Sequence, residues 1–588
     1  MMKKLMKKSI VNTLVIAIAL SGYTAVASTS NNSLSSTQLA AARYDSAHDI
    51  FYPVYAKKGM VASEQALASE VGAMILQQGG NAVDAAVAVG FALAVVLPNA
   101  GNIGGGGFMV LHDAQSAESF TIDFRETAPA KASRDMYLDK EGNVIDGLSL
   151  YSHMAVGVPG TVAGLEYALQ KWGSLSLDKV LSPAIKLAEQ GFIVGPMLAK
   201  TFENEKDNLA KWEETRAIFF KDGEPLKEGD LLVQKDLANS LKLIAEQGSH
   251  AFYQGEIAQK IVAEMQANKG LITLEDLKNY KVIERKPIIG EYRGYKIVTM
   301  PPPSSGGIHL VQILNMLEHY PITEYGVNSA KSIHYLAESM KLAYADRSEY
   351  LGDPDFVKIP VSGLISKQYA NTLVQNISDN IRPASDIKPG KPQPYESDQT
   401  THFSVMDQYG NAVAVTYTLN FNFGSGIVAK GTGILLNDEM DDFSAKPGVP
   451  NGFGLIGGDA NAIAPYKRPL SSMTPTIVMK DNKPWLVTGS PGGARIITTV
   501  LQSIINVIDH GMNPAEAIVT PRVHHQWLPD ELRVEEGLSP DTLALLKAKG
   551  YNVKEKAPMG RVQIIQAGRN GFYGYSDPRN PEGKTIGY

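Results

Sequence analysis

Apolar positions repeat with a helical period over much of the first half of the chain. The pattern predicts helices over residues 63–78 and 82–96. The second of these is apolar nearly all round, which is typical of a helix buried on every side. Short strands are predicted over residues 108–112 and 120–124, and from residue 159 to about 280 the pattern is mainly helical.

The pattern changes twice in the second half. A strand predicted over residues 295–300 is followed by helices to about residue 350. Residues 381–399 then contain four prolines and neither a helical nor a strand period. Such a composition is typical of an exposed interdomain linker, and a processing loop is the alternative.

Beyond residue 400 the chain becomes rich in predicted strands. Two hairpins are expected, one joining residues 401–406 to 412–419 and one joining residues 476–480 to 485–488. A helix with an apolar stripe follows Gly492-Gly493 and ends at Gly511. If Asp407 faces Asn411 in the first hairpin, antiparallel pairing places Thr418 opposite Thr400, to within one residue.

The first 27 residues differ from the rest. Residues 10–20 are mostly apolar but too few to span a bilayer, and Ala25-Val26-Ala27 has the small-x-small pattern of a cleavage site. A basic stretch precedes them, made of Lys3, Lys4, Lys7 and Lys8. A membrane anchor is the alternative, but this pattern favours a signal peptide cleaved near Ala27-Ser28. Loss of its four lysines and no acids changes the formal net charge from −6 to −10.

Composition excludes several classes of function. Cysteine is absent, so disulfides and cysteine catalysis are excluded. No basic run occurs after the leader, which argues against nucleic-acid binding, and no H-E-x-x-H motif is present. We therefore expect no metal, cofactor or stable membrane insertion. Export without disulfides fits the bacterial periplasm or exterior, and we expect the periplasm.

Thr400 is the candidate nucleophile. A threonine hydroxyl needs an adjacent base, and a cut between Gln399 and Thr400 would give Thr400 a free α-amine. The pKa of such an amine is about 8, against about 10.4 for lysine, so it accepts a proton near neutral pH. One residue would then supply both nucleophile and base.

Other candidate positions are ambiguous when taken singly. Gly492-Gly493 lies between a strand and a helix and could bind an anion or an oxyanion, although an ordinary turn is commoner. Gly104–Gly107 lacks the dinucleotide spacing and is better explained by close helix–strand packing. Arg125 would by default be a surface residue, and Asp441-Asp442 a solvated turn. By default, too, Ser471-Ser472 would cap a helix and His524-His525 would be structural. No G-x-S-x-G elbow occurs.

Taken together and in order, these motifs resemble those of the γ-glutamyltransferases (glutathione hydrolases). The resemblance covers essentially the whole mature chain and is densest after Thr400. It is carried by residues 123–129 (DFRETAP), 400–405 (TTHFSV), 411–420 (NAVAVTYTLN), 440–444 (MDDFS), 468–473 (RPLSSM) and 489–493 (GSPGG).

The resemblance implies a fold and a processing step. The family's fold is α+β, a four-layer αββα sandwich of the N-terminal nucleophile hydrolase type. The precursor cuts itself once, through attack of the Thr400 hydroxyl on the Gln399 carbonyl, an N-to-O acyl shift and ester hydrolysis. The products would be a large subunit, 28–399, and a small subunit, 400–588, intertwined as one heterodimer.

The resemblance also implies a role for each site residue. Thr400 matches the nucleophile, Thr418 the residue that orients it, and Gly492 and Gly493 the oxyanion hole. The α-carboxylate of a γ-glutamyl group would be bound by Arg125, Ser471 and Ser472, and its α-ammonium by Asn420, Glu439 and Asp442. The donor would be glutathione or another γ-glutamyl compound, and the acceptor water, an amino acid or a peptide, without cofactor or metal.

Two other readings and one departure from the family pattern remain. A cephalosporin (glutaryl) acylase is a close relative, but a glutaryl group has no amine for Asp442 to bind. A catalytically inactive binding protein would lack the matched residues, all of which are present. Residues 447–458 match a lid over the pocket, and Phe453 stands where enterobacterial members carry a tyrosine. Phenylalanine fills the same space but cannot form a hydrogen bond.

Overall fold

The computed structural model describes residues 51–392, 402–452 and 454–588. Within them, helices and two large antiparallel sheets are mixed along the chain, as expected for the α+β class. The expected leader, the Gln399–Thr400 bond and Phe453 lie outside the described residues. No helix among the described residues is long and apolar enough to cross a membrane.

The first sheet has seven strands and draws on both ends of the chain. Its strand order is β1-β22-β21-β17-β16-β11-β10, and each neighbouring pair is antiparallel. The bounds are β1 (Val54–Ala56), β22 (Phe572–Ser576), β21 (Gln563–Ala567), β17 (Lys483–Gly489), β16 (Thr476–Lys480), β11 (Tyr295–Thr299) and β10 (Ile288–Tyr292).

The second sheet also has seven strands, and the hairpin after residue 400 lies at its centre. Its order is β23-β2-β12-β13-β3-β4-β9, again antiparallel throughout. The bounds are β23 (Lys584–Gly587), β2 (Met60–Ser63), β12 (His402–Met406), β13 (Ala412–Thr418), β3 (Gly106–Asp113), β4 (Glu118–Phe124) and β9 (Ile283–Arg285).

The two sheets contact each other through β12 and β13 on one side and β16, β17 and β21 on the other. A methionine-rich apolar cluster joins them, and it includes Met60, Phe108, Met406, Ile477 and Val487, all 2% exposed or less. Methionine suits this position because its flexible side chain fills irregular gaps between sheets. The strands that carry the candidate site are therefore held from both faces.

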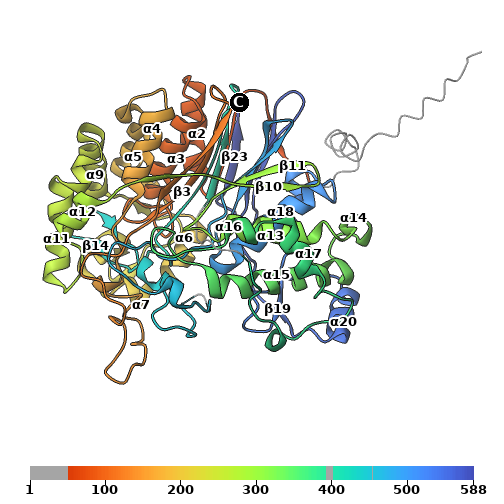
Figure 1. Ribbon diagram of the computed structural model, residues 1–588. Helices are drawn as coiled ribbons and strands as arrows, with labels where there is room; N and C mark the ends of the chain where they lie inside the picture. The colour runs from red at the N-terminus through yellow and green to blue at the C-terminus, as the bar shows by residue number, and fades with distance from the viewer. Residues whose placement is uncertain (1–50, 393–401, 453) are drawn as a thin grey trace, which may run out of the picture.

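Helices cover the outer face of each sheet (Figure 1). The second sheet contacts α2 (Ala66–Gln77), α3 (Ala82–Val96) and α4 (Thr161–Trp172), and α5 (Leu177–Gln190) contacts α3. The first sheet contacts α13 (Gly306–Leu317), α18 (Ile496–Ile508) and α19 (Pro514–Val519), and α13 contacts α15 (Ala330–Tyr350). Every residue of α3 is buried, so its all-round apolar pattern predicts its environment correctly.

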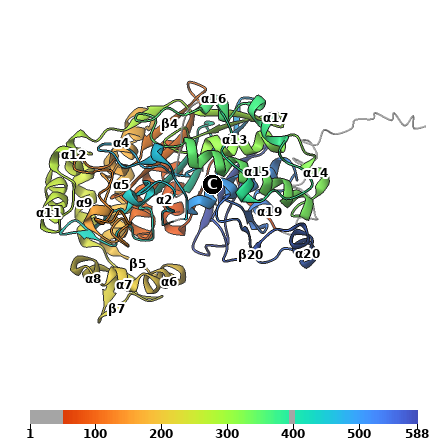
Figure 2. The ribbon, with the colours of Figure 1, turned by 60° about the horizontal axis from the view of Figure 1, so that its bottom comes forward.

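The remaining helices lie mainly at the periphery. Figure 2 shows α6, α7 and α8 projecting from one side of the molecule. The bounds are α6 (Pro196–Asn204), α7 (Lys206–Leu209), α8 (Glu213–Phe219), α9 (Lys235–Gln247), α10 (His250–Tyr253), α11 (Glu256–Ala267), α12 (Leu274–Asn279), α14 (Ile322–Tyr325), α16 (Val361–Leu364), α17 (Lys367–Val374) and α20 (Pro540–Lys549). Short strands complete the list: β5 (Phe192–Ile193), β6 (Phe220–Lys221), β7 (Glu224–Pro225), β8 (Leu231–Leu232), β14 (Val428–Ala429), β15 (Ile434–Leu435), β18 (Val523–His524), β19 (Leu532–Val534) and β20 (Val553–Glu555).

The predicted register of the central hairpin is confirmed over its described part. His402 pairs with Thr416 and Met406 with Ala412, and the amide of Asp407 donates to the carbonyl of Asn411 at 3.2 Å. Thr418 ends β13, where it pairs with Gly106 of β3. The predicted helix over 63–78 begins later, at Ala66, because residues 60–63 form β2.

The glycine run that leads into β3 closely approaches the ends of two strands, β13 and β15, rather than the helix that the packing interpretation expected. A Cβ atom on Gly105 would lie 1.9 Å from the carbonyl oxygen of Thr418, and one on Gly104 would lie 2.0 Å from that of Leu435. No side chain fits at these distances without moving backbone. The glycines therefore set the position of the end of β13.

We expect Gly105→Ala to lower the free energy of unfolding by about 1–3 kcal/mol, because relieving an overpacked contact requires backbone shifts. The variant should also lose activity, since the end of β13 moves. Urea unfolding of Gly105→Ala beside Gly458→Ala measures this. The methyl of the control approaches no atom closer than 3.3 Å. Equal stability of the two variants would contradict the packing account.

Candidate active site

Arg125 follows directly after β4 and is fully buried, so the default expectation of a surface arginine is wrong. Its guanidinium bonds to Glu439, to Asp442 at 2.6 Å and, through Nε, to the carbonyl of Pro469 at 3.4 Å. The side chain thus joins β4 to two segments more than 300 residues away. A lysine would replace this planar fork by a compact ammonium and would not match the geometry of two carboxylates and a carbonyl.

The two carboxylates belong to a single 3₁₀ turn, Glu439–Asp442, whose residues are all buried. The expectation of a solvated turn at Asp441-Asp442 is therefore wrong. Asn437 holds the turn in place, because its Oδ1 accepts from the amides of Glu439 and Gly157 while its Nδ2 donates to the carbonyls of Gly104 and Gly157. The turn is thereby tied to the glycine run before β3.

Electrostatics leave this region short of positive charge. Arg125 faces three buried carboxyl groups: Glu439, Asp442 and, at 3.6 Å, Glu126. Burial raises the pKa of Glu439 and of Asp442 well above the ordinary range, and Arg125 opposes that rise. Burial likewise raises the pKa of Glu126 to about 7. A second cation beside the turn would favour the ionised carboxylates.

Several polar atoms here have no hydrogen-bond partner among the described residues. They are buried and include three acceptors, Asn420 Oδ1, Glu439 Oε2 and Asp442 Oδ1, together with the hydroxyl of Ser471. A buried polar group without a partner costs about 1–3 kcal/mol, so such a group in a folded protein usually awaits a ligand or water. Asn420 is held near the turn because its Nδ2 donates to the carbonyl of Asp438 at 3.0 Å.

Ser471 and Ser472 lie in an extended segment before β16, so the expectation that they cap a helix is wrong. The hydroxyl of Ser305 donates to the carbonyl of Ser471 at 3.1 Å, and Arg347 lies 3.5 Å from the hydroxyl of Ser472. The segment begins at Pro469, the residue that accepts from Arg125. The serines are therefore placed by the same arginine as the acidic turn.

Gly492 and Gly493 form the turn between β17 and α18, with φ angles of +141° and +57°. Such angles favour glycine. A 3₁₀ turn, Gly493–Arg495, intervenes before the α-helix, so the helix begins later than expected. The turn lies close to the start of β12, because a Cβ on Gly489 would be 2.3 Å from the ring of His402. Burial lowers the pKa of His402 to about 3, so its ring is neutral.

The structure thus brings together Arg125, Glu439, Asp442, Asn420, Pro469 and the Ser471 segment. Thr418 is tied to this group, since its hydroxyl accepts from the amide of Asn420 at 2.7 Å. Gly492 and Gly493 lie in the turn that follows β17 of the facing sheet. Gln399 and Thr400 themselves lie outside the described residues, so their predicted roles stay predictions.

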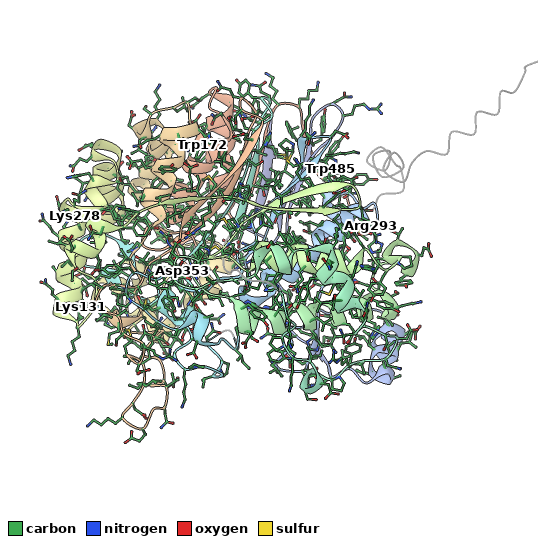
Figure 3. All side chains as sticks on the ribbon, in the orientation of Figure 1. Lys131, Trp172, Lys278, Arg293, Asp353 and Trp485 are labelled. Atoms are coloured by element: carbon green, nitrogen blue, oxygen red, sulfur yellow. The ribbon has the colours of Figure 1, made fainter. Side chains whose placement is uncertain are left out.

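Sequence reasoning missed the residues that hold Arg125 and its partners. Asp123 accepts from the backbone amide of Arg125 at 3.0 Å and pairs with Arg468 at 2.7 Å. Asp353, labelled in Figure 3, is buried and accepts from the amide of Arg468 at 2.7 Å. Asn461 bonds both the carbonyl of Asp442 and the amide of Leu470. The sequence offered two signals: an acid inside the apolar strand β4, and the presence of Asp123 and Arg468 in the matched motifs.

A cavity of about 240 Å³ adjoins the acidic turn. Its lining combines the turn with residues of the predicted lid, and includes Ser149, Arg347, Asp441, Asp442, Val449, Pro450, Gly452, Leu455 and Ile456. The segment predicted to form the lid is bonded to the turn, because the amide of Gly452 donates to Asp441 at 3.0 Å. This segment and the acidic turn therefore form one wall of the cavity.

The described residues contain no group of three or more acidic, histidine or cysteine side chains able to hold a metal ion. His524 lies 2.8 Å from the hydroxyl of Thr498 and 3.0 Å from Gln526. Burial lowers its pKa to about 3. These contacts fit the structural role predicted for His524.

Comparison with known proteins identifies the family of this chain. A sequence profile described as gamma-glutamyltranspeptidase matches residues 68–587. The chain belongs to the γ-glutamyltranspeptidase family. The glutathione hydrolase proenzyme of Escherichia coli K12 is 61% identical over 550 residues, 93% of this chain and 94% of that protein.

Solved structures show the same relationship. A cephalosporin acylase from Bacillus halodurans has a TM-score of 0.83 at 28% identity, covering 92% of this chain and 97% of its own. The Helicobacter pylori gamma-glutamyltranspeptidase has a TM-score of 0.55 at 49% identity, covering 58% of this chain and 97% of that one. The structural neighbours therefore include proteins named for two different activities.

We expect Arg125→Lys to raise KM for a γ-glutamyl donor by roughly tenfold or more, because the planar fork that joins both carboxylates is lost. Steady-state kinetics on the purified protein measures this. Arg134→Lys is the matched control, because that arginine is 50% exposed and pairs with Asp459 at the surface. An unchanged KM in the Arg125 variant would contradict its assignment to the site.

Proposed function

We propose that the protein hydrolyses the γ-glutamyl amide bond of glutathione and related compounds, and transfers the γ-glutamyl group to amino acids or peptides. Membership of the family supports this. The observation that carries it is a set of three buried oxygen atoms without a hydrogen-bond partner among the described residues: Asn420 Oδ1, Glu439 Oε2 and Asp442 Oδ1. They lie on or next to the acidic turn that Arg125 binds. Three acceptors and a local shortage of positive charge match the α-ammonium group of a γ-glutamyl donor.

The same geometry suits the donor's α-carboxylate. Arg125 uses three of its five N–H groups within the protein, so two remain for a carboxylate. The unpartnered hydroxyl of Ser471 provides another donor, and Ser472 is its neighbour. With both α groups bound, the γ-carbonyl is oriented toward Thr400.

The proposed chemistry is a double displacement on Thr400. Its Oγ attacks the γ-carbonyl carbon while its own α-amine takes the hydroxyl proton. The amides of Gly492 and Gly493 stabilise the oxyanion, and Thr418 orients the nucleophile. The C–N bond breaks, the proton passes to the leaving amine, and a γ-glutamyl ester remains. Water or an acceptor amine then attacks the ester and restores Thr400.

The proposal includes self-cleavage at Gln399–Thr400 and two subunits, 28–399 and 400–588. Both large sheets contain strands from each segment, which supports an intertwined heterodimer. We propose that helices, two sheets and helices stack as the four-layer αββα sandwich of the N-terminal nucleophile hydrolases. Removal of residues 1–27 on export to the periplasm completes the maturation.

Thr400→Ala should abolish both cleavage and turnover, because it removes the attacking hydroxyl. A denaturing gel should show two fragments for the wild type and one full-length band for the variant, and glutathione hydrolysis should be absent in the variant. Thr401→Ala is the matched control, since it removes a neighbouring hydroxyl that is not at the cut. Full turnover by an uncut Thr400→Ala chain would overturn the mechanism.

Acylase activity is the second candidate, favoured by the TM-score of 0.83 to the cephalosporin acylase. A glutaryl group lacks the α-amine, so it would leave Asn420, Glu439 and Asp442 without a partner. We therefore expect kcat/KM for glutathione to exceed that for a glutaryl amide by about 100-fold or more, since unpaired buried groups discriminate strongly. Comparable values for the two substrates would favour the acylase instead.

A further inference from the structure

A second pair of arginines lies beyond the glycine turn. Arg495 ends the 3₁₀ turn that Gly493 begins, and Arg533 lies in β19, directly opposite His524 of β18. The hydroxyl of Thr498 links the backbone of Arg495 to His524, because it donates to the carbonyl of Arg495 at 3.0 Å and lies 2.8 Å from the ring of His524. Arg533 is close enough for its charge to repel that of Arg495. The two cations are therefore brought together by the fold.

These arginines have few partners among the described residues. Arg495 makes no ion pair or side-chain hydrogen bond there, and its buried Nε has no acceptor. Arg533 donates from Nη2 to the carbonyl of Ala557 at 2.7 Å, and its Nε is also buried without an acceptor. Unpaired arginines with buried donor atoms are costly to keep unless an anion is bound there at some stage.

The nearby carboxylates are engaged elsewhere. Glu531 pairs with Lys556, and Glu535 pairs with Arg579. Burial, and then repulsion from Arg533, lower the pKa of Arg495 to about 10. An anion placed between the two guanidinium groups would relieve this repulsion.

The pair also lies next to the lid and the proposed oxyanion hole. Gln526 bonds to His524 at 3.0 Å and donates to the carbonyl of Gly454 in the lid at 3.4 Å. Only Ala494 separates Arg495 from Gly493 in the chain. Arg125 and the acidic turn would bind the α-carboxylate and α-ammonium of the donor. The γ-carbonyl would then lie at Gly492-Gly493, and Arg495 would lie on the side of the leaving group.

We propose that Arg495 and Arg533 form an anion subsite for the carboxylate of the peptide that leaves, or attacks, the γ-glutamyl carbonyl. The inference rests on the proposed function and extends it to acceptor and leaving-group selection. The chemical class is a short peptide or amino acid with a free carboxylate. The arginines position that peptide and take no part in bond breaking.

The test compares two acceptors that differ only in charge, glycylglycine and glycylglycine amide. The donor is a γ-glutamyl anilide, whose leaving group has no carboxylate. For the wild type we expect a lower KM for glycylglycine than for its amide. In Arg495→Gln and Arg533→Gln the KM for glycylglycine should rise about tenfold, the loss expected for one charge-assisted bond. The ratio of the two KM values should then approach one.

Controls separate a positioning role from a structural one. Arg569→Gln removes an exposed arginine and should keep the wild-type ratio. Arg495→Lys should restore most of the preference, because the charge is retained. A ratio that stays at the wild-type value in both glutamine variants, or an equal loss with both acceptors, would overturn the subsite.

Failure of the proposed function is seen separately. Hydrolysis of the anilide in the absence of any acceptor tests the donor site alone. A wild-type protein that releases no aniline overturns the proposed function, and the subsite with it. A protein that releases aniline but shows no preference for the acceptor carboxylate overturns only the subsite.

Discussion

The buried guanidinium of Arg125 is the constraint on which the site depends. A fully buried charge is tolerated only where it is paired and hydrogen-bonded, and here the partners come from residues more than 300 positions away in the sequence. The strand β4, the acidic turn and the segment before Ser471 must therefore be correctly placed together. Further hydrogen bonds fix the position of these three segments, and they are made by Asp123, Arg468 and Asn461.

Local patterns in the sequence predicted local structure well. The all-round apolar run gave α3 to the residue, and the turn at Asp407–Asn411 gave the register of β12 and β13. Both depend on neighbours in the chain. The strand β23 was missed because its partner β2 lies more than 500 residues earlier, and no local pattern reports such a pairing.

The same distinction applies to the site. Considered alone, Arg125, Asp441-Asp442 and Ser471-Ser472 were expected at the surface, in a solvated turn and at a helix cap, and the structure corrects all three. Burial depends on partners far away in sequence, which composition cannot reveal. The family resemblance assigned most of these residues to one site, because it depends on several motifs that occur in the same order along the chain. It did not reveal Asn437 and Asn461, whose amide groups connect backbone segments.

The place of β12 and β13 in the second sheet has a mechanical consequence. They are flanked by β2 on one side and β3 on the other, both from the earlier part of the chain. A break in the backbone before His402 removes no rung of these ladders. The two pieces would stay joined by backbone hydrogen bonds, and separating them would require breaking three strand pairs of this sheet: β23–β2, β2–β12 and β13–β3.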